Sequence, residues 1–235
     1  MKDLLGTAIL DYYNTAIDTN IITETTISEP DEMPVSYWFR NYVQMPLIEQ
    51  TALQQCCGSI LDVGCGAGSH SLYLQDERNL DVMAIDISEK AIKVCASRGI
   101  RKVKQIDILD LSNQKFDTII LLMNGTGIFK TLSEISKYLN KIKELLNDGG
   151  QVLIDSSDLI YMFDDAGDGT KRVPAEGYYG ELTFNISYKN EVDEPFEWLY
   201  VDFNTLQNAC NNNGFSCSLL CEGTNFDYLA KLQLL

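Results

Sequence analysis

Between residues 59 and 155 the chain alternates short apolar runs with segments of helical spacing, and this pattern constrains the fold more than any other feature of the sequence. The apolar runs have the length of buried strands, and the segments between them have the length of helices. The predicted strands are 59–63, 81–86, 103–107, 116–123 and 151–155, and the predicted helices are 68–77, 88–98 and 132–147. Because strands that alternate with helices in this way form right-handed βαβ units, we expect a parallel sheet.

The first 55 residues lack this alternation. Residues 3–19 and 35–55 have apolar positions near helical spacing, with a bend expected at Pro46, whereas residues 20–34 are polar and predict a loop. We therefore expect residues 1–55 to form a helical cap beside the sheet.

A second departure follows the fifth predicted strand. Residues 164–180 are rich in glycine and aspartate and predict a long loop, and the alternating segments 181–188 and 196–201 predict a hairpin. We expect this insertion to cover the substrate side of the sheet.

The end of the chain returns to the core pattern, with a predicted helix at 203–213 and strands at 215–222 and 228–234. Two strands joined by a tight loop are antiparallel. The sequence thus predicts a single α/β domain, a Rossmann-like doubly wound sheet of about seven strands whose last strand is antiparallel. Its expected parts, within residues 1–235, are the helical cap 1–55, the core 56–157 and 202–235, and the lid 158–201.

A glycine-rich turn follows the first predicted strand. Gly64, Gly66 and Gly68 precede the next helix, where glycine lets the backbone pass close to a ligand and the helix start offers N–H donors. Asp86 ends the next strand 22 positions after Gly64, where an acidic residue can either bind ribose hydroxyls or begin the helix. These two signals predict a nucleoside cofactor without separating S-adenosylmethionine (SAM) from NAD.

In five places the sequence resembles the class I SAM-dependent methyltransferases. LDVGCGAG is similar to their first motif, VMAIDIS to the second and QID to the acidic third, while FDTIILLMN resembles their fourth strand and LLNDGGQVLID their last helix–strand element. The resemblance covers about residues 56–155. It implies a methyltransferase that uses SAM and releases S-adenosylhomocysteine (SAH). The GxGxG form differs from the GxGxxG of dinucleotide sites and disfavours the alternative, an NAD-dependent oxidoreductase.

The same resemblance implies roles for particular residues. Gly64, Cys65 and Gly66 would lie against the methionine part of SAM, Asp62 would hold its amino group, and Asp86 would bind its ribose. The rest of the expected cofactor set is Gly68 and Ile87 beside these residues, Asp107 and Ile108 at the adenine, and Met123 and Asn124 beneath the methyl group. The alternative interpretation of Asp107 is a capping residue at the end of its strand.

Arg40 completes the expected cofactor set. With Lys2, it is one of only two basic residues among the first 57. The carboxylate of SAM needs a cationic or N–H partner, and N-terminal helices commonly cover SAM in the methyltransferases that this chain resembles. The alternative for Arg40 is an ion pair at the surface.

Five residues are candidates for contact with the substrate: Tyr37, His70, Asp155, Asp158 and Tyr178. His70 is either a general base or a residue that caps and packs the helix after the glycine turn. Asp155 and Asp158 follow the fifth strand, where ligands bind in open α/β sheets, and they either orient a cationic or hydroxylated substrate or form local turns. For Tyr37, which precedes Trp38 and Phe39, the aromatic run favours core packing over contact with a ligand. No catalytic residue is assigned.

The net charge of −16 is concentrated in two segments, with −6 in residues 1–50 and −9 in residues 155–202. A field of this sign repels phosphate backbones, so we expect no nucleic-acid partner. The acidic lid either attracts a small acceptor that is neutral or cationic, or only aids solubility. The alternatives to a small-molecule methyltransferase are a SAM-binding protein without activity and a partner that methylates a protein.

The remaining composition predicts a cytoplasmic protein with reduced thiols. The chain has seven cysteines without a CxxC pair, one histidine, and no apolar run long enough to span a bilayer. The N-terminus lacks the pattern of a signal peptide. We therefore expect neither a membrane partner nor a metal.

Overall fold

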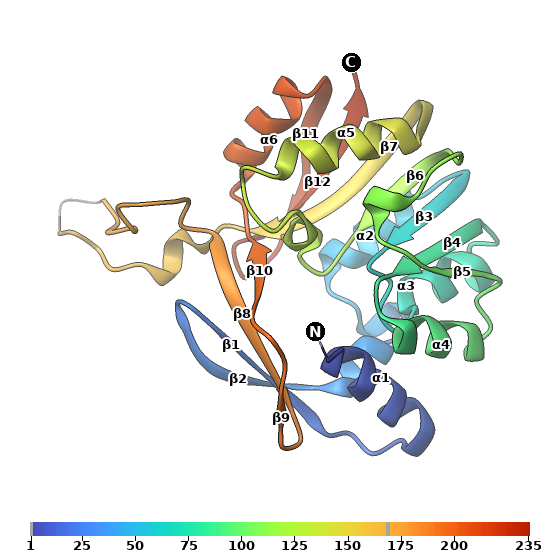
Figure 1. Ribbon diagram of the computed structural model, residues 1–235. Helices are drawn as coiled ribbons and strands as arrows, with labels where there is room; N and C mark the ends of the chain where they lie inside the picture. Colours follow the sequence, from blue (N-terminus) through green and yellow to red (C-terminus); the bar gives the residue numbers. More distant parts are fainter. Residues whose placement is uncertain (1, 168–169) are drawn as a thin grey trace.

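The computed structural model describes residues 2–167 and 170–235. Its centre is a seven-stranded sheet in the order β11-β12-β7-β6-β3-β4-β5 (Figure 1). The strands are β3 (Ser59–Val63), β4 (Asp81–Asp86), β5 (Lys102–Gln105), β6 (Phe116–Leu121), β7 (Leu146–Ser157), β11 (Phe215–Glu222) and β12 (Asp227–Leu234). Strands β3 to β7 are mutually parallel, and β12 is antiparallel to both of its neighbours. The predicted Rossmann-like sheet with an antiparallel last strand is confirmed.

Helices cover both faces of this sheet because successive side chains of each strand point to opposite sides. Leu61 and Val63 pack with residues of α5 and α6, whereas Ile60 and Val82 pack with residues of α2. The α-helices are α1 (Leu4–Thr15), α2 (Leu47–Gln55), α3 (Ser69–Leu72), α4 (Glu89–Ser97), α5 (Ile135–Leu145) and α6 (Phe203–Asn212). This two-sided cover is the doubly wound arrangement that the alternation of strands and helices predicts.

The prediction of a purely helical N-terminal cap is wrong. Residues 20–34 form two strands, β1 (Asn20–Thr25) and β2 (Ser28–Pro34), where a loop was expected. β2 pairs only with β1 and exposes most of its acidic side chains, so it lacks the apolar alternation that identifies a strand in a sequence. Pairing with a distant segment stabilises the hairpin, because β1 also lies against β8 (Glu181–Tyr188).

The predicted helix over residues 35–55 is also shorter than expected. Only α2 is α-helical, and Pro46 immediately precedes it. Before Pro46 the chain makes two 3₁₀ turns, η1 (Val35–Phe39) and η2 (Tyr42–Gln44). Proline at the start of a helix costs no backbone hydrogen bond, so Pro46 begins a helix and does not bend one.

The second sheet joins the N-terminal hairpin to the predicted lid. Its order is β10-β8-β1-β2, with β9 (Glu191–Val192) also paired to β8. β8 and β10 (Phe196–Leu199) are antiparallel, as the sequence predicts, with Phe196 opposite Phe184. The end of β10 meets the carboxyl ends of β6 and β7, because the Leu199 carbonyl accepts from Thr126 Oγ1 and Val201 N–H donates to Ser156 Oγ. The second sheet therefore lies beside the edge where ligands bind in open α/β sheets (Figure 1).

Candidate cofactor and acceptor site

The glycine turn after β3 has the backbone conformation that its sequence requires. Gly64, Gly66 and Gly68 have φ angles of +73°, +53° and +82°, which favour glycine. The N–H groups of Gly64 and Cys65 donate to the Ile85 carbonyl at 2.9 and 3.1 Å, which ties the turn to β4. A Cβ at Gly64 would meet no atom within 4 Å, so open space lies against this turn.

The inner side of the turn is closely packed. Cys65 is buried, with its Sγ 3.7 Å from Cys95 Sγ in α4, and a Cβ at Gly68 would lie 2.3 Å from the Ile100 side chain. On its other side the turn meets the N-terminal segment, since a Cβ at Gly66 would lie 3.2 Å from the Trp38 ring and Ser69 Oγ donates to the Trp38 carbonyl at 2.7 Å. Residues 35–44 thus cover the turn.

Asp86 lies beside the turn at the end of β4. One of its carboxylate oxygens accepts from Gly66 N–H at 2.9 Å, and the other accepts from Ser88 N–H at 2.8 Å. Burial raises the pKa of Asp86, although these two N–H groups stabilise the charged form. Ile87, which follows, is 60% exposed.

Asp107 occupies the equivalent place after β5. It caps the short 3₁₀ turn η4 (Ile108–Asp110), with Oδ1 accepting from Leu109 N–H at 2.9 Å, while Ile108 is buried. The capping role read from the sequence is therefore present, and only one oxygen takes part in it. Asp86 and Asp107 follow adjacent parallel strands, so they lie along the same edge of the sheet.

The Asp62 side chain lies on the face of β3 opposite to Leu61 and Val63, where it is buried. Its Oδ2 accepts from Ser71 Oγ of α3 at 2.6 Å. Burial raises the pKa of Asp62, and the charge of His70 opposes this effect.

The chain after β6 makes a left-handed turn. Met123 and Asn124 have φ angles of +67° and +60°, which are uncommon for residues other than glycine. Asp155 at the end of β7 stabilises this turn, since its two oxygens accept from Met123 N–H at 3.1 Å and Gly125 N–H at 2.8 Å. Burial is the main cause that raises the pKa of Asp155 to about 6. Asp155 therefore fixes the backbone of the turn that we expect, from the resemblance, to lie beneath the methyl group.

Arg40, Glu49 and His70 form a buried cluster at this edge. One guanidinium nitrogen of Arg40, Nη2, donates to both Glu49 oxygens at 2.9 and 3.1 Å, and His70 Nε2 lies 2.7 Å from Glu49 Oε2. The guanidinium also lies 3.5 Å from the centre of the Tyr37 ring, and Nη2 lies 3.7 Å from Met123 Sδ. The cluster therefore joins the N-terminal segment, α2 and α3 to the turn after β6.

Sequence reasoning missed Glu49. The sequence clue is its spacing: Glu49 lies three and four positions before Ala52 and Leu53, which places it on the apolar face of α2. In the structure Glu49 is only 3% exposed. A carboxylate at such a position needs a partner, and Arg40 is the nearest basic residue in the sequence.

Tyr178 and Asp158 lie in the segment predicted as the lid, and both side chains form hydrogen bonds with other residues of the chain. The Tyr178 hydroxyl donates to Asp202 Oδ2 at 2.6 Å and accepts from Asp202 N–H at 2.9 Å. Asp158 Oδ1 accepts from Ile160 N–H and from the Tyr179 hydroxyl. These contacts stabilise the base of the loop between β7 and β8.

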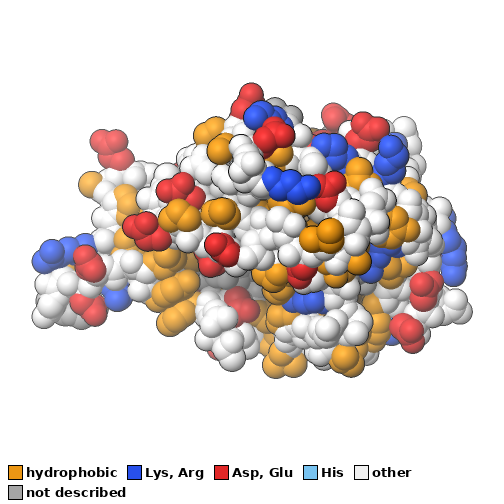
Figure 2. Space-filling view, turned by 90° about the horizontal axis from the view of Figure 1, so that it is seen from below, with side chains coloured by type: hydrophobic (Ala, Val, Ile, Leu, Met, Phe, Trp, Pro, Cys, Tyr) orange, Lys and Arg blue, Asp and Glu red, His pale blue; other side chains and the backbone are white. Residues whose placement is uncertain are grey.

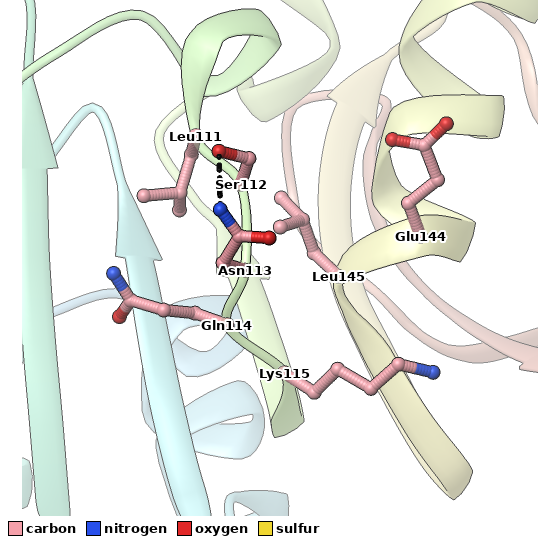
Figure 3. A pocket seen from close by; sticks show the side chains of 7 residues that line it. All are labelled: Leu111, Ser112, Asn113, Gln114, Lys115, Glu144 and Leu145. Atoms are coloured by element: carbon pink, nitrogen blue, oxygen red, sulfur yellow. Dashed lines mark hydrogen bonds between the residues drawn. The ribbon is translucent and has the colours of Figure 1, made fainter.

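A hollow of about 410 Å³ lies at the opposite edge of the sheet (Figure 3). Its lining comes from residues 111–115, which precede β6, and from Glu144 and Leu145 at the end of α5. The Lys115 ammonium donates to the Leu146 carbonyl, and Glu144 pairs with Lys141. The hollow is remote from the glycine turn, because it adjoins the amino ends of β6 and β7.

Within residues 2–167 and 170–235, no three His, Cys, Asp or Glu side chains gather as metal ligands would. No helix within these ranges is long and apolar enough to cross a bilayer.

Comparison with known proteins agrees with this geometry. A family model described as a methyltransferase domain matches residues 58–198. A SAM-dependent methyltransferase from Bacteroides fragilis, solved in complex with SAH, is 42% identical, with a TM-score of 0.91 over 99% of this chain and 95% of that chain. No curated protein sequence matches the chain.

More distant structures share the fold. The CcbJ methyltransferase from Streptomyces caelestis is 14% identical, with a TM-score of 0.65 over 98% of this chain and 97% of that one. DesVI from Streptomyces venezuelae is 18% identical, with a TM-score of 0.58 over 85% and 92%. On the family match and the 42% identical structure, the cofactor is SAM and the chain belongs to the class I SAM-dependent methyltransferases.

Proposed function

We propose that this methyltransferase acts on a small molecule that is neutral or cationic, bound where β6 and β7 end. The observation that carries the proposal is the buried carboxylate of Asp155 beside a group of aromatic side chains at this edge. Burial raises the pKa of Tyr37 most; the charge of Arg40 lowers it, and the charges of Glu49 and Asp155 raise it. Because Glu49 is already paired with Arg40 and His70, Asp155 is the carboxylate at this edge that favours a cation over an anion.

Aromatic side chains of the second sheet support an acceptor with an apolar or cationic part. The Phe184 ring lies 5.9 Å from Phe196, 6.1 Å from Trp198 and 6.2 Å from Tyr200. Trp198 packs on Gly127 in the segment after β6, where a Cβ would lie 1.9 Å from its ring. Burial raises the pKa of Tyr200 to about 12, with smaller effects from Tyr161 and Asp155. Aromatic rings near carboxylates are a common means of binding amines.

The acidic excess of residues 155–202 gives only weak support for a cationic acceptor. Several of these carboxylates stabilise the chain itself: Asp193 accepts from the backbone of Lys2 and Leu4, Asp202 caps α6, and Glu181 accepts from Leu132 N–H. Figure 2 shows acidic side chains dispersed among apolar ones, and they do not form one patch on this face. The proposed preference for a neutral or cationic acceptor therefore depends on Asp155 and on the aromatic side chains of the second sheet.

The residues at this edge fit SAM on two observations. Open space lies against Gly64, and Nη1 of Arg40 is buried without a hydrogen-bond partner among the described residues. We propose that Arg40 holds the carboxylate of the cofactor, Asp86 its ribose and Asp107 its adenine, while Met123 and Asn124 lie beneath the methyl group. Asp62, Cys65, Gly66, Gly68, Ile87 and Ile108 complete the proposed cofactor site.

SAM supplies a methyl group already activated by a positively charged sulfur. The acceptor atom forms the new bond with its lone pair, the sulfur keeps the electrons of the broken C–S bond, and a proton on the acceptor passes to solvent. The protein's contribution is then to orient the acceptor and exclude competing water, which is the largest available gain for a reagent of this kind.

A screen with methyl-labelled SAM tests the proposal. Wild-type protein is incubated with matched small molecules that carry an amine, a neutral hydroxyl group or a phosphate, and, in a separate reaction, with a protein mixture. We expect label in an amine or a hydroxylated compound. Label confined to phosphate esters or to proteins would overturn the proposed acceptor class.

A further inference from the structure

The cluster of Arg40, Glu49 and His70 contains more buried groups than one cofactor contact needs. The side chains are 10%, 5% and 10% exposed. They come from three elements: Arg40 follows η1, Glu49 lies in α2, and His70 lies in the first turn of α3. Burying three ionisable groups is costly unless they are paired with each other or with a ligand.

Glu49 is shared between the other two residues. Its oxygens accept from Arg40 Nη2 at 2.9 and 3.1 Å, and Oε2 also lies 2.7 Å from His70 Nε2. Arg40 Nε donates to the Tyr37 carbonyl at 2.7 Å, so the guanidinium is held on two sides. Within the described chain, its remaining nitrogen, Nη1, is buried and has no hydrogen-bond partner.

Protonation of His70 makes the net charge of the cluster positive. Burial lowers the pKa of His70, but its hydrogen bond to Glu49 and the charge of Glu49 outweigh burial and leave that pKa raised. Burial raises the pKa of Glu49, but His70 and Arg40 outweigh it and leave that pKa lowered. Two cations thus face one anion when His70 is protonated.

The neighbouring acids do not satisfy the unpaired donor. Asp62 of β3 accepts from Ser71, and Asp155 of β7 has both oxygens on the backbone of the turn after β6. The other facing groups are the Tyr37 ring and the Met123 sulfur, which carry no charge. A buried N–H donor beside an excess of positive charge is suited to a carboxylate.

We propose that Glu49 and His70 are positioning residues for the carboxylate end of the cofactor, and that they hold Arg40 so that Nη1 faces this carboxylate. The inference rests on the proposed role of Arg40 and extends it to two residues with no assigned role in binding the cofactor. The ligand class is an adenosyl thioether or sulfonium that carries an α-amino carboxylate. Substitution of Glu49 would release the guanidinium and the imidazole together.

The arrangement links binding of this carboxylate to a proton. An anion beside the cluster stabilises protonated His70, so the affinity for a carboxylate ligand falls as the pH rises above the pKa of His70. A ligand without the carboxylate lacks this dependence. The matched pair is SAH and 5′-methylthioadenosine, which share the adenosyl thioether.

Calorimetry on the full chain tests the inference. We expect Glu49→Gln and His70→Gln each to weaken the binding of SAH about tenfold and to change the affinity for 5′-methylthioadenosine less than about twofold. Glu144→Gln, an exposed carboxylate at the opposite edge, is the control for loss of one negative charge. Equal losses for both ligands, or no loss for either, would overturn the proposal.

Two further measurements separate the possible failures. If Arg40→Ala does not distinguish the two ligands, the proposed role of Arg40 itself fails; if only Arg40→Ala distinguishes them, the inference about Glu49 and His70 fails alone. Should either variant not fold, wild-type protein still decides. Titrations in buffers of different ionisation enthalpy should show net proton uptake with SAH at pH values above the pKa of His70 and none with 5′-methylthioadenosine, and equal uptake would contradict the proposal.

Discussion

At the scale of single residues, Asp86 has one function that the structure displays and one that we propose. Its oxygens already accept from Gly66 and Ser88, which shapes the turn next to the proposed ribose site. We predict that Asp86→Ala weakens the binding of SAM by about 1.5–3 kcal/mol, as expected for the loss of hydrogen bonds to a charged group. Calorimetry measures this loss. Asp110→Ala removes an exposed carboxylate nearby and should leave the affinity unchanged; an equal effect of both variants would contradict the assignment.

Asp155 gives the stability of the protein a defined dependence on pH. Burial raises its pKa from 3.8, the ordinary value for aspartate, to about 6 in the folded protein, so the folded state binds more protons than the unfolded state between these two pH values. The contribution of Asp155 to stability therefore falls as the pH rises through this window, by up to about 3 kcal/mol. Urea unfolding at pH 4 to 7 should show wild type losing stability relative to Asp155→Asn. If the stabilities of wild type and Asp155→Asn changed in parallel with pH, the raised pKa of Asp155 would be refuted.

The residue that sequence reasoning missed illustrates a general limit. Arg40 was identified because cations are rare near the N-terminus, yet its partner Glu49 gave no comparable signal among eight acidic residues in the first fifty. Only the fold shows that Glu49 is buried and shared with His70. Pairing across three elements depends on tertiary packing, which the local pattern of a single sequence does not specify.

At the scale of elements, the contact between β10 and the segment after β6 should control the acceptor site. A Cβ at Gly127 would overlap the Trp198 ring. We predict that Gly127→Ala displaces β10, destabilises the protein by about 1–3 kcal/mol and raises the KM of the acceptor, while SAH affinity changes less than twofold. Thermal unfolding, steady-state kinetics and calorimetry measure these effects.

The matched test uses a double variant. If the clash with Trp198 is the cause, Gly127→Ala should cost less stability in a Trp198→Ala background than in wild type, because the two sites are coupled. Additive losses would place the effect of Gly127→Ala elsewhere.

The elements differ in how far the sequence predicts them. β3 and β4 were predicted over the residues they occupy, because their apolar runs are buried on both faces. β7 begins five residues earlier than predicted, since its first part, Leu146–Gly150, contains polar residues and glycines. β2 was missed entirely because it is an acidic edge strand whose pairing with β1 does not require an apolar face.

At the scale of the whole molecule, strand order and the position of the glycine turn place the site at one edge of the sheet. This much follows from the alternation of strands and helices together with GxGxG. The second sheet could not be foreseen, since it joins residues 20–34 to residues 181–199 across most of the chain. It is also this sheet that brings Trp198 and Leu199 to the turn after β6, so the surroundings of the proposed acceptor site were less predictable than the glycine turn after β3.

The most direct test of the account compares two acceptors from the labelled screen that share the reacting group and differ at one remote position, which carries an amine in one (the amine) and a carboxylate in the other (the carboxylate). With the buried Asp155 carboxylate at the acceptor site, kcat/KM should be higher for the amine, and it should fall as salt is raised because ions screen the attraction. The steady-state rates of the pair at low and high ionic strength measure both effects. A faster reaction with the carboxylate, or a rate with the amine that rises with salt, would contradict the account.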